Sequence, residues 1–243
     1  MPSAPSAPSA RLNPSPFAAH YVHLRSLRAA MQRAIERNLG GRSGLSIIDV
    51  GCGDRPYEPL LAPYAGRYVG VDYRPGPKVD LVAPAEALPV PSESFDCLIS
   101  SQVLEHVDDP YAVMREVHRV LKPGGVALVS THGTVNYHPN PDDYWRWTHA
   151  GLAQLFRLTG EWTRVDVHPN GGTGSALAYL VGRQLEALAY KLKARWLTAV
   201  PSFALNVAGW NLDRLYRRAY PSRPPDLSSN YLAVGIRGGD ASA

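Results

Sequence analysis

At 243 residues the chain is long enough for one α/β domain with an insertion and a substantial buried core. Its only two cysteines, Cys52 and Cys97, lie inside apolar stretches without zinc-ligand spacing, which excludes a disulfide-rich scaffold and favours a reduced, intracellular protein with no metal site. The formal net charge of +4 is uneven, because residues 183–223 hold eight Lys or Arg against two acids, a net +6.

The N-terminal region divides into a tail and a helix. Residues 1–14 repeat Ser-Ala-Pro units, bury too little apolar surface to fold and lack the apolar core of a secretory signal, so a disordered tail is expected. Ser15-Pro16 can start a helix and Gly40-Gly41 can end it. Between them apolar side chains recur at three- and four-residue steps: Phe17, Tyr21, Leu24, Leu27, Met31, Ile35 and Leu39. This pattern predicts an amphipathic helix that covers a sheet edge.

The next stretch, Ile47-Ile48-Asp49-Val50-Gly51-Cys52-Gly53, has the pattern of a buried parallel strand that ends in a tight turn. Glycines at such a turn permit positive φ and a close approach of a ligand to the backbone. Tyr68-Val69-Gly70-Val71-Asp72-Tyr73 is a second strand, and its acid follows the glycines by roughly twenty residues. At that spacing a carboxylate accepts hydrogen bonds from two ribose hydroxyls, so Gly51, Gly53 and Asp72 predict a cradle for a nucleoside-like ligand.

Strands and helices then alternate along the chain. The further expected strands are residues 80–83, 95–101, 126–131, 163–167 and 230–236. Asp108-Asp109-Pro110 should start one helix, Gly124-Gly125 should stop it, and Thr148 should cap the next. This alternation predicts a parallel sheet with right-handed crossovers.

Six motifs follow one another between residues 47 and 125. They are Ile-Ile-Asp-Val-Gly-Cys-Gly (47–53), Val-Gly-Val-Asp (69–72), Ala-Glu-Ala-Leu-Pro-Val-Pro (85–91), Ser-Phe-Asp-Cys-Leu-Ile-Ser-Ser (94–101), Leu-Glu-His-Val (104–107) and Leu-Lys-Pro-Gly-Gly (121–125). In this order they resemble the class I S-adenosylmethionine-dependent methyltransferases, within them the broad type-11 group. The resemblance implies a doubly wound, mostly parallel seven-stranded sheet of Rossmann-like topology.

The resemblance also implies domain boundaries. The methyltransferase domain would span residues 15–171 and 227–238. The family commonly joins its last two strands by a short connection, whereas some sixty residues separate them here. Residues 172–226 are therefore expected to be a helical insertion before the last strand.

An S-adenosylmethionine site along the carboxyl ends of the strands is implied as well. Its implied residues are Asp49, Gly51, Cys52, Gly53, Asp72, Tyr73, Ala85, Glu86, Ser101 and Gln102. In the family the turn at Ala85 and Glu86 holds the adenine, and the end of the fourth strand lies against the methionine part. An N-terminal helix often packs beside this site.

The chain departs from the family pattern after the second glycine. Arg55 stands where a third glycine is expected, and Pro84 stands where an acid usually contacts the adenine. Because a residue before proline is kept out of the helical region, the helix after Arg55-Pro56 should start late and end near Ala62-Pro63.

Residues 131–148 are the most polar and aromatic stretch, and two prolines exclude regular structure there. The stretch follows a strand at the binding edge of the sheet, where loops tend to carry function. Methyl transfer to a hydroxyl needs a general base, for which the candidates are His106, His132, His138 and Tyr144. Trp145, Arg146 and Trp147 are candidates for substrate binding, although Arg146 can instead pair with an acid of the same loop. For each histidine, a hydrogen bond that orients a loop is the alternative role.

The segment 172–226 combines apolar and basic character. The uncharged run from Trp196 to Leu212 falls short of the ~20 residues that a membrane-spanning helix needs. Basic residues flank this run: Lys191, Lys193, Arg195, Arg214, Arg217 and Arg218. We expect a lid, a dimer element or a helical pair that lies on an anionic membrane surface.

The predicted function is methyl transfer from S-adenosylmethionine to a small or lipid-linked acceptor, such as a sugar, a phenol or a quinone. The protein would be cytoplasmic, either free or membrane-associated, and without a nucleic-acid partner, since no Asn/Asp-Pro-Pro-Tyr-like motif is present. Two alternatives stay open. An NAD-dependent oxidoreductase would need a glycine where Pro56 stands, and a Tyr-x-x-x-Lys pair that the chain lacks. A non-catalytic binding or assembly protein of methyltransferase-like fold would be compatible with Arg55 and Pro84.

Overall fold

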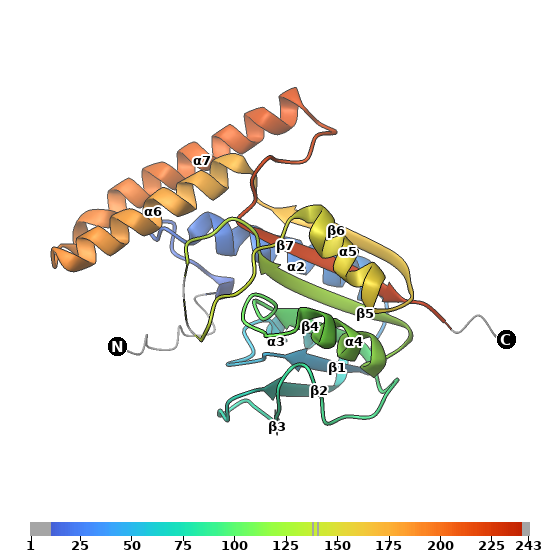
Figure 1. Cartoon of the computed structure of the whole chain (residues 1–243). Helices are drawn as coiled ribbons and strands as arrows, with labels where there is room; N and C mark the ends of the chain where they lie inside the picture. Colours follow the sequence, from blue (N-terminus) through green and yellow to red (C-terminus); the bar gives the residue numbers. More distant parts are fainter. Residues whose placement is uncertain (1–10, 138, 140, 240–243) are drawn as a thin grey trace.

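The computed structural model of the chain describes residues 11–137, 139 and 141–239. Its centre is a seven-stranded sheet with the strand order β3-β2-β1-β4-β5-β7-β6 (Figure 1). The strands are β1 (Leu45–Val50), β2 (Ala65–Asp72), β3 (Leu81–Val82), β4 (Phe95–Ser101), β5 (Leu121–His132), β6 (Trp162–Asn170) and β7 (Asn230–Arg237). Neighbouring strands are parallel except that β7 runs antiparallel to β5 and β6. The expected doubly wound, mostly parallel sheet is thereby confirmed.

Helices cover both faces because the central strands are apolar on both sides. On one face, α4 (Pro110–Val120) and α5 (His149–Thr159) pack on a core that includes Ile48 of β1. On the other face, α2 (Tyr21–Leu39) and α3 (Glu58–Leu61) pack on a core that includes the adjacent Ile47. The alternation of side chains along one strand thus serves two cores. The parallel pairing of β1, β2, β4 and β5 brings their carboxyl ends to one edge of the sheet.

Local capping follows the sequence signals closely. Asp109 accepts hydrogen bonds from the backbone N–H groups of the first turn of α4, and Thr148 accepts one from the first turn of α5. The helix α3 is short and ends before Ala62-Pro63, as expected. The expected helix N-termini at residues 109 and 148 are thus confirmed.

Two element boundaries differ from expectation. The helix expected to start at Ser15-Pro16 begins at Tyr21, because the intervening residues form turns whose carbonyls at Pro16 and Ala18 accept from the Asn206 amide. The strand β5 begins at Leu121, five residues before the expected start, and α4 ends at Val120. The chain becomes extended there because Leu121 pairs with Phe95 of β4.

A disordered tail is expected over residues 1–14, and its first ten residues lie outside the described part of the chain. Leu12, by contrast, packs against the α2 core, and its carbonyl accepts from Arg28. Residues 11–14 of the expected tail are therefore part of the described structure.

Between β6 and β7 the chain forms two long helices, α6 (Thr173–Lys191) and α7 (Ala199–Ala219), joined by the 3-10 turn η1 (Arg195–Thr198). They lie side by side as a hairpin that projects beyond the sheet (Figure 1). At its base, the buried Asp213 carboxylate accepts from the N–H groups of Gly172, Gly174 and Ser175 and from the Ser175 hydroxyl. Within the described ranges, no helix is both long enough and apolar enough to cross a bilayer.

Candidate functional site

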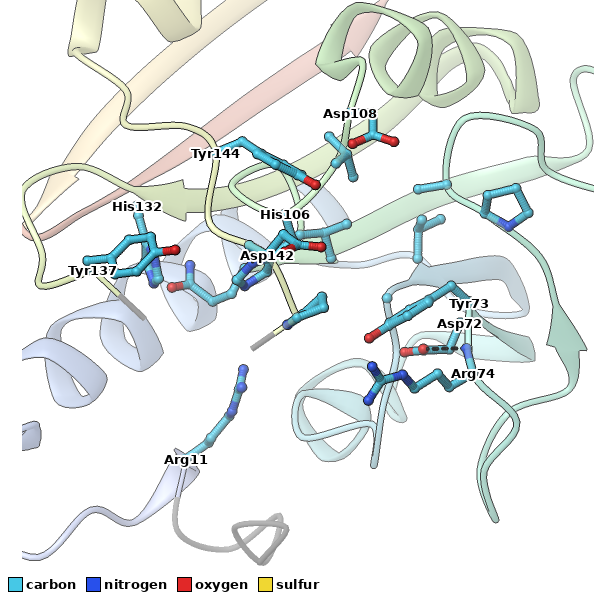
Figure 2. Close-up of a pocket in the computed structure, with 18 of the residues that line it drawn as sticks. Arg11, Asp72, Tyr73, Arg74, His106, Asp108, His132, Tyr137, Asp142 and Tyr144 are labelled. Atoms are coloured by element: carbon cyan, nitrogen blue, oxygen red, sulfur yellow. Dashed lines mark hydrogen bonds between the residues drawn. The ribbon is translucent and has the colours of Figure 1, made fainter. Parts of the chain in front are cut away.

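A cavity of about 820 Å³ opens at the carboxyl ends of β1, β2, β4 and β5 (Figure 2). Val50, Asp72, Gln102 and His132 stand at or just beyond these four strand ends, and all four line it. Ligands of doubly wound sheets bind at this edge. In Figure 2, Asp72 and Tyr73 lie on one side of the cavity and His106 and His132 on the other.

The glycine turn and the β2 acid meet as the sequence predicts. Gly51 has φ +72°, and a Cβ there would lie 2.2 Å from a methyl group of Val103. Gly53 has φ +48°, and its N–H donates to Asp72 Oδ2 at 3.0 Å. Asp72 Oδ1 accepts from the Arg74 N–H at 3.1 Å. Gly51 and Asp72 line the cavity, and the Gly53 N–H holds the carboxylate next to them. The two glycines and the carboxylate therefore form one cradle, and the positive φ of both glycines disfavours other residue types at these two positions.

Four of the expected cofactor residues are not among those that line the cavity. They are Asp49 and Cys52, which are buried, and Gly53 and Ser101. Burial raises the pKa of Asp49 to about 7, although a 2.7 Å hydrogen bond from Tyr68 Oη lowers it. Ser101 Oγ lies 2.9 Å from Ser130 Oγ. These side chains support the turn and the strand ends instead of facing the cavity.

The other expected cofactor residues line the cavity. Tyr73, Ala85, Glu86 and Gln102 are among the lining residues. Gln102 has φ +63°, a strained conformation for a residue other than glycine, and its N–H donates to the Ser130 carbonyl at 2.9 Å. Strain held by the surrounding structure is typical of functional turns.

The departure at Arg55 is accommodated within the fold. Arg55 has φ +52°, outside the right-handed helical region, as its place before Pro56 predicts. Its guanidinium pairs with Asp80 and lies 3.6 Å from Glu58. A Cβ at Gly70 would lie 2.7 Å from Arg55 Nε, so the arginine fills space beside β2.

A buried carboxylate joins two of the candidate bases. Glu105 is 0% exposed, and burial raises its pKa to about 7. A 2.9 Å hydrogen bond from Thr131 Oγ1 acts in the opposite direction and lowers this pKa. His132 Nε2 lies 3.3 Å from Glu105 Oε1, and His106 Nε2 lies 4.0 Å from the same atom. His106 Nδ1 also contacts the carbonyl of Asp142. Both histidines line the cavity, so a carboxylate can orient an imidazole there.

The polar-aromatic loop contributes differently from expectation. Tyr144 lines the cavity, whereas His138 lies outside the described residues. Trp145, Arg146 and Trp147 are not among the lining residues. Trp145 Nε1 donates to the Val107 carbonyl at 2.8 Å, Arg146 pairs with Asp143, and Trp147 packs against the core. These three side chains therefore stabilise the conformation of the loop. For Arg146, pairing with an acid of the same loop was the alternative that the sequence left open.

Several lining residues were not predicted from the sequence. They are Arg11, His20, His23, Tyr137, Tyr179 and Arg183. His23 of α2 stacks on Tyr179 of α6 at 5.0 Å, and its Nδ1 lies 3.0 Å from Ser229 Oγ. The polar positions on the buried side of α2 were the available signal, because a buried histidine in an amphipathic helix needs a polar partner. Across the described residues, no cluster of three or more His, Cys, Asp or Glu is arranged to hold a metal ion.

Comparison with known proteins places this geometry in a known group. A family model described as "Methyltransferase domain" matches residues 21–168. A probable S-adenosylmethionine-dependent methyltransferase of Mycolicibacterium smegmatis is 36% identical over 110 residues, which cover 41% of this chain and 43% of that protein. A ubiquinone biosynthesis O-methyltransferase of Ruegeria pomeroyi is 33% identical over 121 residues, which cover 43% of this chain and 48% of that protein. The matches therefore span less than half the length of these relatives.

Solved structures share the fold. The [4+2]-cyclase SpnF superposes with a TM-score of 0.55 at 21% identity, over 89% of this chain and 84% of that chain. The phosphoethanolamine N-methyltransferase 2 of Haemonchus contortus, in complex with S-adenosylmethionine, has a TM-score of 0.54 at 16% identity, over 98% of this chain and 62% of that chain. At these identities the likeness establishes the fold.

Proposed function

The chain belongs to the methyltransferase domain family, and we propose that it binds S-adenosylmethionine and transfers the methyl group to a small or lipid-linked acceptor. The observation that carries this proposal is the cradle of Gly51, Gly53 and Asp72, of which Gly51 and Asp72 line the cavity. The cradle fits an adenosyl group, because the glycine backbone permits close approach and the carboxylate can accept from ribose hydroxyls. Tyr73, Ala85 and Glu86 would hold the adenine side, and Gln102 the amino-acid side.

When bound, S-adenosylmethionine supplies an electrophilic methyl group on a sulfonium. The protein then has to orient the acceptor, exclude water and remove a proton where the acceptor is a hydroxyl. We infer that His132 is the general base, because it lines the cavity and its Nε2 lies 3.3 Å from Oε1 of the buried Glu105. His106, His138 and Tyr144 would then serve to position the acceptor or the loop.

The acceptor side of the cavity favours a ring-shaped polar molecule such as a sugar, a phenol or a quinone. Tyr137, Tyr144 and Tyr179 line it together with histidines, and aromatic rings stack on such molecules. The O-methylation of a ubiquinone precursor fits the name of one relative. We propose that the helical segment 172–226 closes this side, because Tyr179 and Arg183 of α6 lie in the cavity wall.

Calorimetric titration of the full chain tests the proposal. S-adenosylmethionine and S-adenosylhomocysteine should bind, and Asp72→Ala should weaken both by about 30-fold or more, because two hydrogen bonds to a charged group are lost. The exposed Asp226→Ala is the matched control and should bind as the wild type does. Binding of NAD in their place would favour the oxidoreductase, and binding of none of the three would favour a non-catalytic role.

A screen with methyl-labelled cofactor against sugars, phenols and quinones then tests the transfer. With an accepted substrate, His132→Gln should lower kcat while the affinity for S-adenosylmethionine stays unchanged. A loss of similar size in His106→Gln, with His132→Gln fully active, would move the base to His106.

A further inference from the structure

The hairpin of α6 and α7 has small residues between its two helices and large apolar residues on its outer surface. At its base the two backbones nearly touch: a Cβ at Gly209 would lie 2.6 Å from the Gly174 carbonyl oxygen and 2.8 Å from the Ala178 Cβ. Small residues fill the seam between the helices, so the large apolar side chains point elsewhere. The hairpin therefore presents much of its apolar surface outwards.

Exposed apolar side chains occur along the whole hairpin, and the three most exposed of them lie at its far end, residues 188–200, called here the hairpin tip. Its exposed side chains are Leu188, Tyr190, Leu192, Trp196, Leu197 and Val200. Leu192 is 68% exposed, Trp196 78% and Val200 74%. Figure 1 shows this end of α6 and α7 extending away from the sheet and its covering helices. Contiguous exposed apolar surface of this kind marks an interaction site.

Charge at the hairpin tip is of one sign. Lys191 and Lys193 are exposed there, and no Asp or Glu occurs anywhere in residues 187–212. The two lysines, with Tyr190 and Trp196, also line a second cavity of about 550 Å³. Ammonium groups beside amphipathic aromatic rings are the side chains that proteins place at the boundary between lipid headgroups and acyl chains.

We propose that the hairpin tip docks on an anionic lipid surface, with Trp196, Leu192 and Val200 in the headgroup layer and the lysines on lipid phosphates. A second copy of the chain fits this surface less well, because it would bring the same cations to the same patch with no acid to pair them. An anionic bilayer supplies both the opposite charge and the apolar layer. The docking does not depend on methyl transfer.

The docking also has a consequence for the cavity. The last residues of α6 form part of the hairpin tip, and Tyr179 and Arg183 of the same helix line the cavity. Resting on the proposed function, this connection fits an acceptor that is held in or near the lipid surface.

Co-sedimentation of the full chain with vesicles tests the docking without any cofactor. Vesicles of phosphatidylcholine with 30% phosphatidylglycerol should bind the protein, and vesicles of phosphatidylcholine alone should bind it at least about tenfold more weakly. Added salt should weaken the binding, because the attraction between lysines and phosphates is screened.

The double variant Trp196→Ser with Lys193→Glu should lose at least about tenfold in affinity for the anionic vesicles. The matched control is Leu158→Ser with Arg157→Glu, which makes the same kinds of change at exposed positions of α5 and should bind as the wild type does. Circular dichroism of both variants confirms that they are folded. Equal binding of the two variants, or no binding of the wild type, would overturn the proposal. So would a dimer in sedimentation that the tip variant alone dissociates.

Discussion

The buried carboxylate of Glu105 provides a sharp test of the site's electrostatics. The side chain is 0% exposed, and burial raises its pKa from an ordinary value near 4.5 to about 7. Between these two pH values the folded protein keeps a proton on Glu105 that the unfolded chain has released. Stability contributed by this group is therefore fully present below pH 4.5, falls as the pH rises and is lost above pH 7.

The size of the effect follows from the same two values. At about 1.4 kcal/mol for each pH unit of that window, the ionisation of Glu105 costs the folded state roughly 3 kcal/mol by pH 8. Glu105→Gln keeps the shape of the protonated acid and removes the ionisation. The variant should match the wild type within about 1 kcal/mol at pH 5 and exceed its free energy of unfolding by up to roughly 3 kcal/mol at pH 8.

Urea unfolding of both proteins at pH 5, 6, 7 and 8 measures this difference. Glu36→Gln on the exposed face of α2 is the matched control, and its difference from the wild type should not vary with pH. A difference for Glu105→Gln that stays flat with pH, or a wild type more stable than the variant at pH 8, would refute the reasoning. Glu105 would then be ionised in the folded state, in a pair with His132.

Two further pairs of substitutions test the cradle and the hairpin. Gly51→Ala should destabilise the protein by about 3 kcal/mol, because its Cβ would lie 2.2 Å from a Val103 methyl group in a positive-φ turn. Gly53→Ala should cost only about 1 kcal/mol, since apart from its chain neighbours no residue has an atom within 4 Å of the added Cβ. Thermal unfolding compares the two variants, and equal losses of stability would contradict the steric argument. Asp213→Ala should lower the free energy of unfolding in urea by about 3 kcal/mol, because it leaves buried N–H donors at the start of α6 without an acceptor. Asp226→Ala removes an exposed ion pair and should cost less than about 0.5 kcal/mol. Similar losses in the two variants would mean that Asp213 does not stabilise the base of the hairpin.

Features that depend on neighbours in the chain were predictable. The β1 strand, the glycine turn after it and the caps Asp109 and Thr148 all follow from residue types a few positions apart. The meeting of Asp72 with Gly53 was also predictable, because adjacent parallel strands bring their carboxyl ends to one edge.

Features that depend on distant segments were not predictable in the same way. His23 of α2 and Tyr179 of α6 both line the cavity and stack on each other, yet more than a hundred residues separate them in the chain. Apolar periodicity shows which helix face is buried, but it does not show which polar residue on that face meets a cavity. The tryptophans of the polar-aromatic loop illustrate the converse, because Trp145 and Trp147 suit a ligand and a packed core equally well in sequence.

The substitution at Arg55 shows why a departure from a family pattern does not by itself remove a site. A third glycine would have left space beside β2, and here the Arg55 side chain takes that space against Gly70 and pairs with Asp80. The Asp80 carboxylate also accepts from the Gly70 N–H at 2.8 Å, so the guanidinium, the glycine and the acid form one closed group. That group lies behind the glycine turn and contributes no lining residue to the cavity. The turn therefore keeps its open side toward Asp72, and the cradle on which the proposed function depends is compatible with an arginine at this position.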